Sequence, residues 1–338
     1  MQVDIVGHDD NATVVRLCDK LRKRGHCVRV VPGDELYVDL SGGDCIVVPY
    51  DVLQVPHVLV SASTTDCLTA LDAIRVLAAA GVPVVNSPEA LEKSANKFRT
   101  ALALQEAGVR HPRVLQVCTA RTASEAARKL GYPVVLKAPD GSEGSAVFLV
   151  DRECDMPDAV TRLRRVCAQD PAGWTPLLVQ ERMAESMGRD KRVLVVGGHA
   201  VACMERVAQP GEWRSNLSQG AHPRPAIMSL DEAAAAVSSV LALGLDFGVV
   251  DVMPLSAGPA VLEVNSFGDL VDIVAMSGVD AIGVLCSFIE SCGGSWCPPA
   301  EGMPRLEPGE WRSEMRFAWA RIARRAAELA EAAASFGG

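Results

Sequence analysis

Short apolar runs alternate with amphipathic stretches over the first 86 residues of the chain. Four of the runs have the length of β-strands: VDIVG (3–7), HCVRVV (26–31), DCIVVP (44–49) and VPVVN (82–86). The stretches at 13–25 and 64–81 repeat apolar residues at helical spacing, and each ends at a glycine, a common helix terminator. Strands that alternate with helices in this way predict a small parallel sheet covered by helices.

The next part of the chain mixes helices and strands in a less regular order. Residues 87–108 predict one long helix, because Ser87 is a good cap, Pro88 suits the first helical turn and Gly108 ends the pattern. The elements predicted after it are a strand following VRHPRVLQV, a helix at 122–131, strands at 132–139 and 146–151, a helix at 154–169 and a strand at 175–183.

Two β-hairpins separated by a helix are predicted in the last third of the chain. The first spans 191–208 and turns at Gly197-Gly198, the helix covers 230–244, and the second hairpin joins GVVDVMPL to VLEVN through SAGP (256–259). After residue 291 the sequence becomes rich in Gly and Pro, and 312–336 predicts a helical tail.

The strand VLEVN places polar residues between apolar ones. Strict alternation would put Val261, Glu263 and Asn265 on one face and Leu262 with Val264 on the other. Buried polar groups need partners, and Asp251 lies twelve positions before Glu263. We therefore expect the hairpin to direct Asp251, Glu263 and Asn265 toward one point.

Composition excludes several classes of function. The net charge of −9 argues against nucleic acid as the main partner, and 4% aromatic residues offer little surface for stacking on bases. No apolar run approaches the roughly 20 residues of a membrane span, and the N-terminus lacks the pattern of a signal peptide. Eleven cysteines without a CxxC pair suit reduced thiols, so the sequence predicts a cytoplasmic protein that binds neither membrane nor nucleic acid.

Three basic or glycine-rich segments have the chemistry of a phosphate site. Lys137 ends an apolar strand and precedes the loop APDGSEGSAV, whose glycines permit close backbone approach and whose serines donate hydrogen bonds. Lys97 is predicted on a helix, and Arg206 and Arg214 bracket a loop, where arginine suits planar recognition of phosphate or carboxylate. Taken singly, each segment is more typical of an ordinary structural feature: a hairpin with a glycine turn, a solvated helix lysine and a charged surface loop, respectively.

Asp251, Glu263 and Asn265 are all oxygen donors. Magnesium prefers oxygen ligands and is commonly bound by one or two carboxylates together with substrate phosphates. The three side chains together therefore predict a metal site.

These segments, in this order, resemble the RimK-like carboxylate–amine ligases of the ATP-grasp superfamily. The resemblance covers roughly residues 1–290 and is weakest in the first 85. It is carried by NKFRTALALQEAGVRHP, YPVVLKAPDGSEGSAV, VQERM, GRDKRVLVVGG, WRSN, GVVDVMPL and VLEVN. Such a protein has an α/β (α+β) ATP-grasp fold, so the resemblance implies a small Rossmann-like N-terminal α/β domain (1–86), a central domain (87–180), a C-terminal grasp domain (181–291), and a linker with a C-terminal helix (292–338).

The resemblance also implies roles for individual residues. Lys97 and Lys137 would contact the phosphates of ATP, under a loop formed by Gly141, Ser142 and Gly144. The adenine would lie along Gln180, Glu181, Arg182 and Met183, with Asp190 near the ribose. Arg214, Ser215 and Asn216 would meet the phosphates. Asp251, Glu263 and Asn265 would hold two Mg²⁺ ions, for which Mn²⁺ could substitute. Arg206 and Arg214 would be the catalytic arginines.

The activity implied by the resemblance is formation of an amide from a carboxylate and an amine through an acyl phosphate, with release of ADP and phosphate. The substrates would be amino acids or a peptide, or the tail of a carrier protein, and the enzyme would form a dimer or tetramer. A catalytically silent ATP-binding regulator and a kinase of a small acid are the alternatives on the same fold.

Three acids depart from the family pattern. Glu143 lies in the glycine-rich loop, and Asp269 and Asp272 follow VLEVN. They either favour an amine-bearing substrate by charge complementarity or are solvated loop acids.

Overall fold

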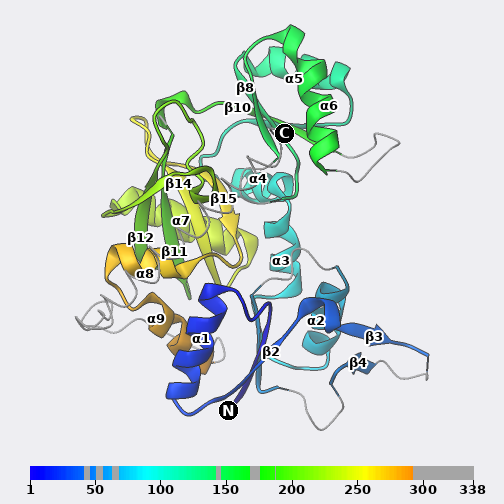
Figure 1. The fold of residues 1–338 in the computed structure, drawn as a ribbon, viewed down its shortest axis with the longest axis vertical. Coiled ribbons are helices and arrows are strands. Elements are labelled where there is room, and N and C mark those ends of the chain that lie inside the picture. Colours follow the sequence, from blue (N-terminus) through cyan, green and yellow to red (C-terminus); the bar gives the residue numbers. More distant parts are fainter. Residues whose placement is uncertain are drawn as a thin grey trace, which may run out of the picture.

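A computed structural model describes residues 1–41, 46–50, 56–62, 68–141, 146–167, 176–186 and 188–291. The predicted linker and tail helix at 292–338 lie outside these ranges. Figure 1 shows three groups of elements: one around α1 and α2, one around β8, β10, α5 and α6, and one around β11, β12, β14 and β15. Within the described ranges, no helix is both long enough and apolar enough to cross a lipid bilayer.

The N-terminal group is built on a parallel sheet, as the sequence predicts. Its elements are β1 (Gln2–Val6), α1 (Ala12–Lys23), β2 (Cys27–Val31), β5 (Val58–Ser61), α2 (Leu68–Ala79) and β6 (Val84–Val85), with strand order β2-β1-β5-β6. The prediction that residues 44–49 join this sheet is wrong, because β4 (Ile46–Val48) pairs antiparallel with β3 (Tyr37–Asp39). The strand that pairs with β1 in this sheet is instead β5. Its four residues are all buried, as expected for a strand that is covered on both faces.

The second group is a four-stranded antiparallel sheet covered on one face. It contains β7 (Val114–Val117), α5 (Ala120–Leu130), β8 (Val134–Lys137), β9 (Val147–Val150), α6 (Met156–Cys167) and β10 (Leu177–Glu181), in the order β7-β10-β8-β9. Val134 and Leu136 belong to the core that the strands share with α5 and α6. Because side chains alternate along a strand, Val135 and Lys137 face the other way.

The single helix predicted at 87–108 is wrong, because the chain forms two helices there. α3 (Pro88–Ala95) and α4 (Lys97–Glu106) are separated by Asn96, whose backbone is extended at φ −112° and ψ 113°. The Asn96 side chain accepts hydrogen bonds from the backbone N–H groups of Phe98 and Arg99, so it caps the second helix. Lys97 is consequently the first residue of α4 and does not lie in a helix interior.

The third group is a five-stranded antiparallel sheet with helices on both faces. It contains β11 (Arg189–Val196), β12 (His199–Val207), β13 (His222–Pro225), α7 (Leu230–Leu243), β14 (Phe247–Met253), β15 (Ala260–Asn265), α8 (Leu270–Ser277) and α9 (Ala281–Glu290), in the order β13-β12-β11-β14-β15. Both predicted hairpins are confirmed. Val193 and Val195 pack with α7, whereas Leu194 and Val196 pack with α8 and α9, as alternation along β11 requires.

The first and third groups share one hydrophobic core. Val3 and Ile5 of β1 and Leu17 of α1 belong to the same buried cluster as α8, α9 and the inner strands β11 and β14. Polar contacts at the edge of this core include Lys20 with Asp280, at 2.7 Å.

Asn86 joins these two groups from a fully buried position. Its Oδ1 accepts hydrogen bonds from the backbone N–H groups of Asp246 and Phe247, at 2.7 and 3.0 Å. Its Nδ2 donates to the backbone oxygens of Phe247 and Ser266, at 3.0 and 2.9 Å. One side chain thus satisfies four backbone groups that have no access to water.

We predict that Asn86→Ala lowers the free energy of unfolding by about 3 kcal/mol, because several buried backbone groups lose their partner at once. The measurement is urea unfolding followed by circular dichroism. Asn11→Ala is the control, since the exposed Asn11 caps α1 and should cost only about 1 kcal/mol. Equal losses for the two variants would contradict the role assigned to Asn86.

Candidate active site

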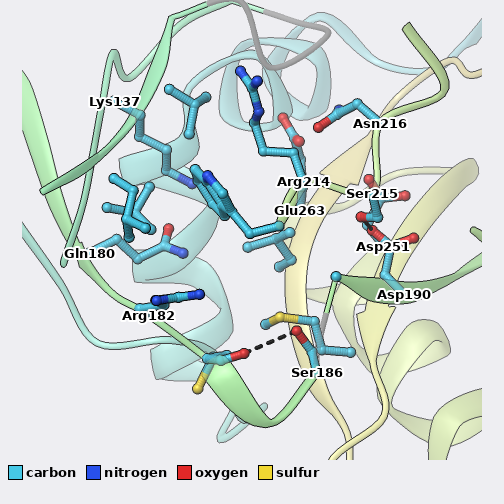
Figure 2. Close-up of a pocket in the computed structure, with 18 of the residues that line it drawn as sticks. Lys137, Gln180, Arg182, Ser186, Asp190, Arg214, Ser215, Asn216, Asp251 and Glu263 are labelled. Atoms are coloured by element: carbon cyan, nitrogen blue, oxygen red, sulfur yellow. Dashed lines mark hydrogen bonds between the residues drawn. The ribbon is translucent and has the colours of Figure 1, made fainter. Parts of the chain in front are cut away.

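A cavity of about 550 Å³ lies between the second and third sheets. Figure 2 shows Lys137 and Gln180 on one side of it and Asp190, Ser215 and Asp251 on the other, with Glu263 between them. This volume is within the range of small-molecule binding sites.

A β-bulge shapes the acidic wall of the cavity, which is formed by Asp251 and Glu263. Asp251 on β14 lies directly opposite Glu263 on β15, but Val252 lies opposite Val261, so the pairing shifts by one residue. Val261 and Val264 are therefore both in the α7 core, while Leu262 and Glu263 both line the cavity. The prediction that Val261 shares the face of Glu263 is wrong, because strict alternation fails at a bulge.

Arg206 on β12 is buried and binds two carboxylates. Its Nε and Nη2 donate to the two oxygens of Asp190, at 2.7 and 2.6 Å, and Nη2 also donates to Asp251 Oδ2, at 2.9 Å. Arg192 donates to the other oxygen of Asp251, at 3.0 Å, and Ser215 Oγ donates to Asp190, at 2.5 Å. Both oxygens of Asp190 and both oxygens of Asp251 are thus engaged in this structure.

The charges in this network stabilise one another. Burial alone would lower the pKa of Arg206, but Asp190 and Asp251 raise it above its ordinary value. Burial alone would raise the pKa of Asp251, but Arg192 and Arg206 lower it. Asp190 shifts in the other direction: burial raises its pKa, although Arg206 and Ser215 oppose the shift. The contact of Arg206 with both oxygens of Asp190 has the geometry of a bidentate arginine–carboxylate pair.

Two lysines line the cavity opposite the acidic wall: Lys97 at the start of α4 and Lys137 at the end of β8. Lys97 Nζ lies 3.1 Å from Glu263 Oε1, and it also donates to the backbone oxygen of Gly141. The backbone N–H of Lys97 donates to the oxygen of Pro139, at 2.8 Å, which ties the start of α4 to the end of β8. Lys137 is only 6% exposed, and burial lowers its pKa to about 8; Glu263 opposes this shift and Lys97 adds to it.

The residues predicted beside the adenine also line the cavity: Gln180, Glu181, Arg182 and Met183. The Glu181 carboxylate, however, is bound by Arg113, at 3.1 Å, and this contact lowers its pKa. Because Arg113 neutralises its carboxylate, Glu181 contributes mainly its backbone and the apolar part of its side chain to the cavity lining.

The segment between β12 and β13 contributes the last predicted group. Arg214, Ser215 and Asn216 line the cavity, next to Glu212 and Trp213. Glu212 accepts hydrogen bonds from the Nε and Nη2 of Arg214, each at 3.0 Å, and these contacts help lower its pKa to about 2.

Most of the predicted site residues thus meet in one cavity. Asn265 is the exception among the described residues: it is not part of the lining, and its Nδ2 donates to the backbone oxygen of Val249, at 3.4 Å. Ser142 and Gly144, with Glu143, lie outside the described residues. Asp269 caps α8 and Asp272 is fully buried, so neither is a solvated loop acid.

Sequence reasoning missed Arg192, Glu212, Trp213 and Leu262. Asp190 precedes the predicted hairpin (191–208) by one residue, but β11 begins at Arg189, and residues two apart on one strand share a face; a longer predicted strand would have paired Asp190 with Arg192. Glu212 precedes Arg214 by two positions in a turn, and Leu262 reaches the cavity only through the bulge.

Comparison with known proteins identifies the family and the fold. Residues 94–289 match the model of the RimK-like ATP-grasp domain. The chain is 30% identical over 295 residues to a probable alpha-L-glutamate ligase of Enterobacter sp. (strain 638), covering 86% of this chain and 96% of that protein. A protein of the same description from Cellvibrio japonicus (strain Ueda107) is 31% identical over 282 residues, covering 81% and 90%.

Solved structures share the fold at lower identity. The ATP-grasp ligase PsnB complexed with a minimal precursor superposes with a TM-score of 0.64 at 22% identity, covering 86% of this chain and 98% of that chain. A RimK domain protein from Sphaerobacter thermophilus DSM 20745 gives a TM-score of 0.64 at 20% identity, covering 85% and 99%.

We predict that Lys137→Met raises the free energy of unfolding by about 3 kcal/mol at pH 7. The folded chain releases the Lys137 proton near pH 8, but the unfolded chain holds it to an ordinary pKa of 10.5, so burying the charge destabilises the fold below pH 8. This destabilisation shrinks between pH 8 and 10.5, and the advantage of the variant should vanish above that range. Urea unfolding at several pH values measures it, with the exposed Lys129→Met as control; a gain that does not depend on pH would contradict the explanation.

Proposed function

The chain belongs to the RimK-like ATP-grasp family, which makes it an ATP-dependent ligase that joins a carboxylate to an amine, and we propose that its cavity is the active site. In this proposal the adenine lies along Gln180 to Met183, and the phosphates lie between the lysines and the acidic wall. The observation that carries the proposal is the meeting of Lys97 and Lys137 with Asp251 and Glu263 in one cavity between two sheets.

The acidic wall fits a divalent cation. Asp251 and Glu263 are directly opposite each other on neighbouring strands and both line the cavity, which gives the carboxylate oxygens that Mg²⁺ prefers. In this structure cationic side chains neutralise them: Lys97 at Glu263, and Arg192 and Arg206 at Asp251. We propose that Asp251 and Glu263 hold the Mg²⁺ that accompanies ATP, two ions in all, which would neutralise phosphate charge. Asn265, which is outside the cavity lining here, would join them by turning its side chain away from the Val249 oxygen.

The proposed mechanism relies on positioning and charge. Lys97 and Lys137 orient the phosphates, and Arg214 adds a third cation from the opposite wall. Transfer of the γ-phosphoryl group to a substrate carboxylate gives an acyl phosphate and ADP; attack of an amine then forms the amide and releases phosphate. Arg206 is the second proposed catalytic arginine; its Nε and Nη2 are bound by Asp190 and Asp251, so its position is fixed without reorganisation during the reaction.

We propose that the substrates are amino acids or a peptide. The relatives in the sequence comparison are named as probable alpha-L-glutamate ligases, and PsnB was determined with a precursor peptide. The cavity volume of about 550 Å³ is within the range of small-molecule sites.

The experiment that tests this proposal measures ADP release with ATP, Mg²⁺ and a panel of amino acids and short peptides, alone and in pairs, with products read by mass spectrometry. ADP release that depends on one pair, with a product mass equal to the pair minus water, supports the proposal and names both substrates. A phosphorylated acid as the final product would overturn it, because the enzyme would then be a kinase.

We predict that Glu263→Gln lowers kcat/KM at least 100-fold, because the amide replaces a metal-binding oxygen and leaves Lys97 without its counter-ion. The coupled ADP-release assay measures this. The matched control is Glu290→Gln, since Glu290 is also a partly exposed, ion-paired glutamate (31% against 27%) but lies on α9 away from the cavity. Activity of Glu263→Gln within a few-fold of wild type would defeat the assignment.

A further inference from the structure

Glu212 places a carboxylate beside the arginine that the proposed function directs at phosphate. The residue lines the cavity, at the turn between β12 and β13, two positions before Arg214. An acid at this place is unexpected on simple electrostatic grounds, because a carboxylate near a triphosphate repels it.

The contacts of Glu212 show what the acid does in this structure. Its Oε1 accepts hydrogen bonds from the backbone N–H groups of Trp213 and Arg214, both at 2.9 Å, and from Arg214 Nε, at 3.0 Å. Its Oε2 accepts from Arg214 Nη2, at 3.0 Å. The carboxylate therefore fixes the backbone of the turn and grips one edge of the guanidinium in a bidentate pair.

Other contacts hold the same turn on either side of Glu212. The Arg214 guanidinium lies over the Trp213 ring, 6.0 Å from its centroid. Ser215 Oγ donates to the buried Asp190, and the backbone N–H of Glu212 donates to the oxygen of Gln209. Ser215 thus anchors the turn to the network of Arg206 and Asp190, and Glu212 holds the side chain of Arg214.

We propose that Glu212 is a positioning residue, which holds the Arg214 guanidinium in the orientation that receives the phosphates of ATP. Arginine has several rotatable bonds, and fixing them before the ligand arrives removes a cost from binding. Glu212 binds the Nε–Nη2 edge of this guanidinium, and Arg214 lines the cavity. This inference rests on the proposed function, in which Arg214 meets phosphate.

Two effects of opposite sign make the proposal testable. If Glu212 acts only through its charge, its removal reduces repulsion and strengthens ATP binding. If it positions Arg214, its removal weakens ATP binding, and only while Arg214 is present.

The decisive variant is Glu212→Gln. The amide oxygen can still accept from the backbone N–H groups of Trp213 and Arg214, but the NH₂ group that replaces Oε2 cannot accept from Nη2. The substitution therefore preserves the turn and the hydrogen bond from Nε to the retained oxygen, and it removes the Nη2 half of the bidentate pair together with the charge of the carboxylate. Glu185→Gln is the matched control, since Glu185 also accepts from a loop backbone N–H, that of Ser256, and is not part of the cavity lining.

The experiment is calorimetric titration of ATP with Mg²⁺ into wild type, Glu212→Gln, Arg214→Ala, the double variant and Glu185→Gln. We expect Arg214→Ala to weaken binding about thirtyfold, as loss of a charged hydrogen bond does, and Glu212→Gln to weaken it roughly fivefold. In the Arg214→Ala background, Glu212→Gln should change the Kd less than twofold, because no guanidinium remains to be positioned. Glu185→Gln should bind as wild type does.

Four results would overturn the proposal. Tighter ATP binding by Glu212→Gln would show that Glu212 acts through charge repulsion. Unchanged binding would show that Glu212 does not affect ATP affinity. An equal loss in both backgrounds would show that Glu212 acts independently of Arg214. Wild-type affinity in Arg214→Ala would remove the proposed phosphate role of Arg214 itself, and the inference with it.

Discussion

The third sheet is organised around the buried guanidinium of Arg206. Arg206 lies in the interior with two carboxylates bound to it, and an unpaired charge in that position would cost several kcal/mol. Because Asp190, Arg206 and Asp251 come from β11, β12 and β14, the network requires these three strands to be in register. It also extends to Arg192 and, through Ser215, to the turn that carries Arg214, so the shape of the cavity follows from satisfying this charge.

The cavity itself is the product of two sheets that offer opposite charge. The second sheet and α4 supply the lysines, and the third sheet supplies the carboxylates. The Lys97–Glu263 pair spans the boundary between them, and the hydrogen bond from Lys97 N–H to Pro139 ties α4 to the second sheet. These groups satisfy one another in this structure, and a polyanion with its cation can replace each partner by one of like charge.

Part of this could be predicted from local patterns. The hairpin of Asp251 and Glu263 and the parallel sheet carry signals at fixed spacing, because alternation and glycine turns are local properties. The other cavity residues, such as Asp190 and Met183, were assigned through the resemblance to the family. The break at Asn96, the bulge at Leu262 and the pairing of β4 with β3 were not predictable in this way. In each case a side-chain cap or a tertiary pairing overrides the local periodicity. The same holds for Arg192 and Glu212, whose importance depends on the partners they meet.

The shared core of the first and third groups has a consequence for the ancestry of the chain. The match to the family begins at residue 94, yet β1, α1 and Asn86 complete the packing of helices and strands that lie far beyond that boundary. The N-terminal segment is therefore not an exchangeable module. A recombination that replaced it would succeed only if the incoming segment matched this apolar surface.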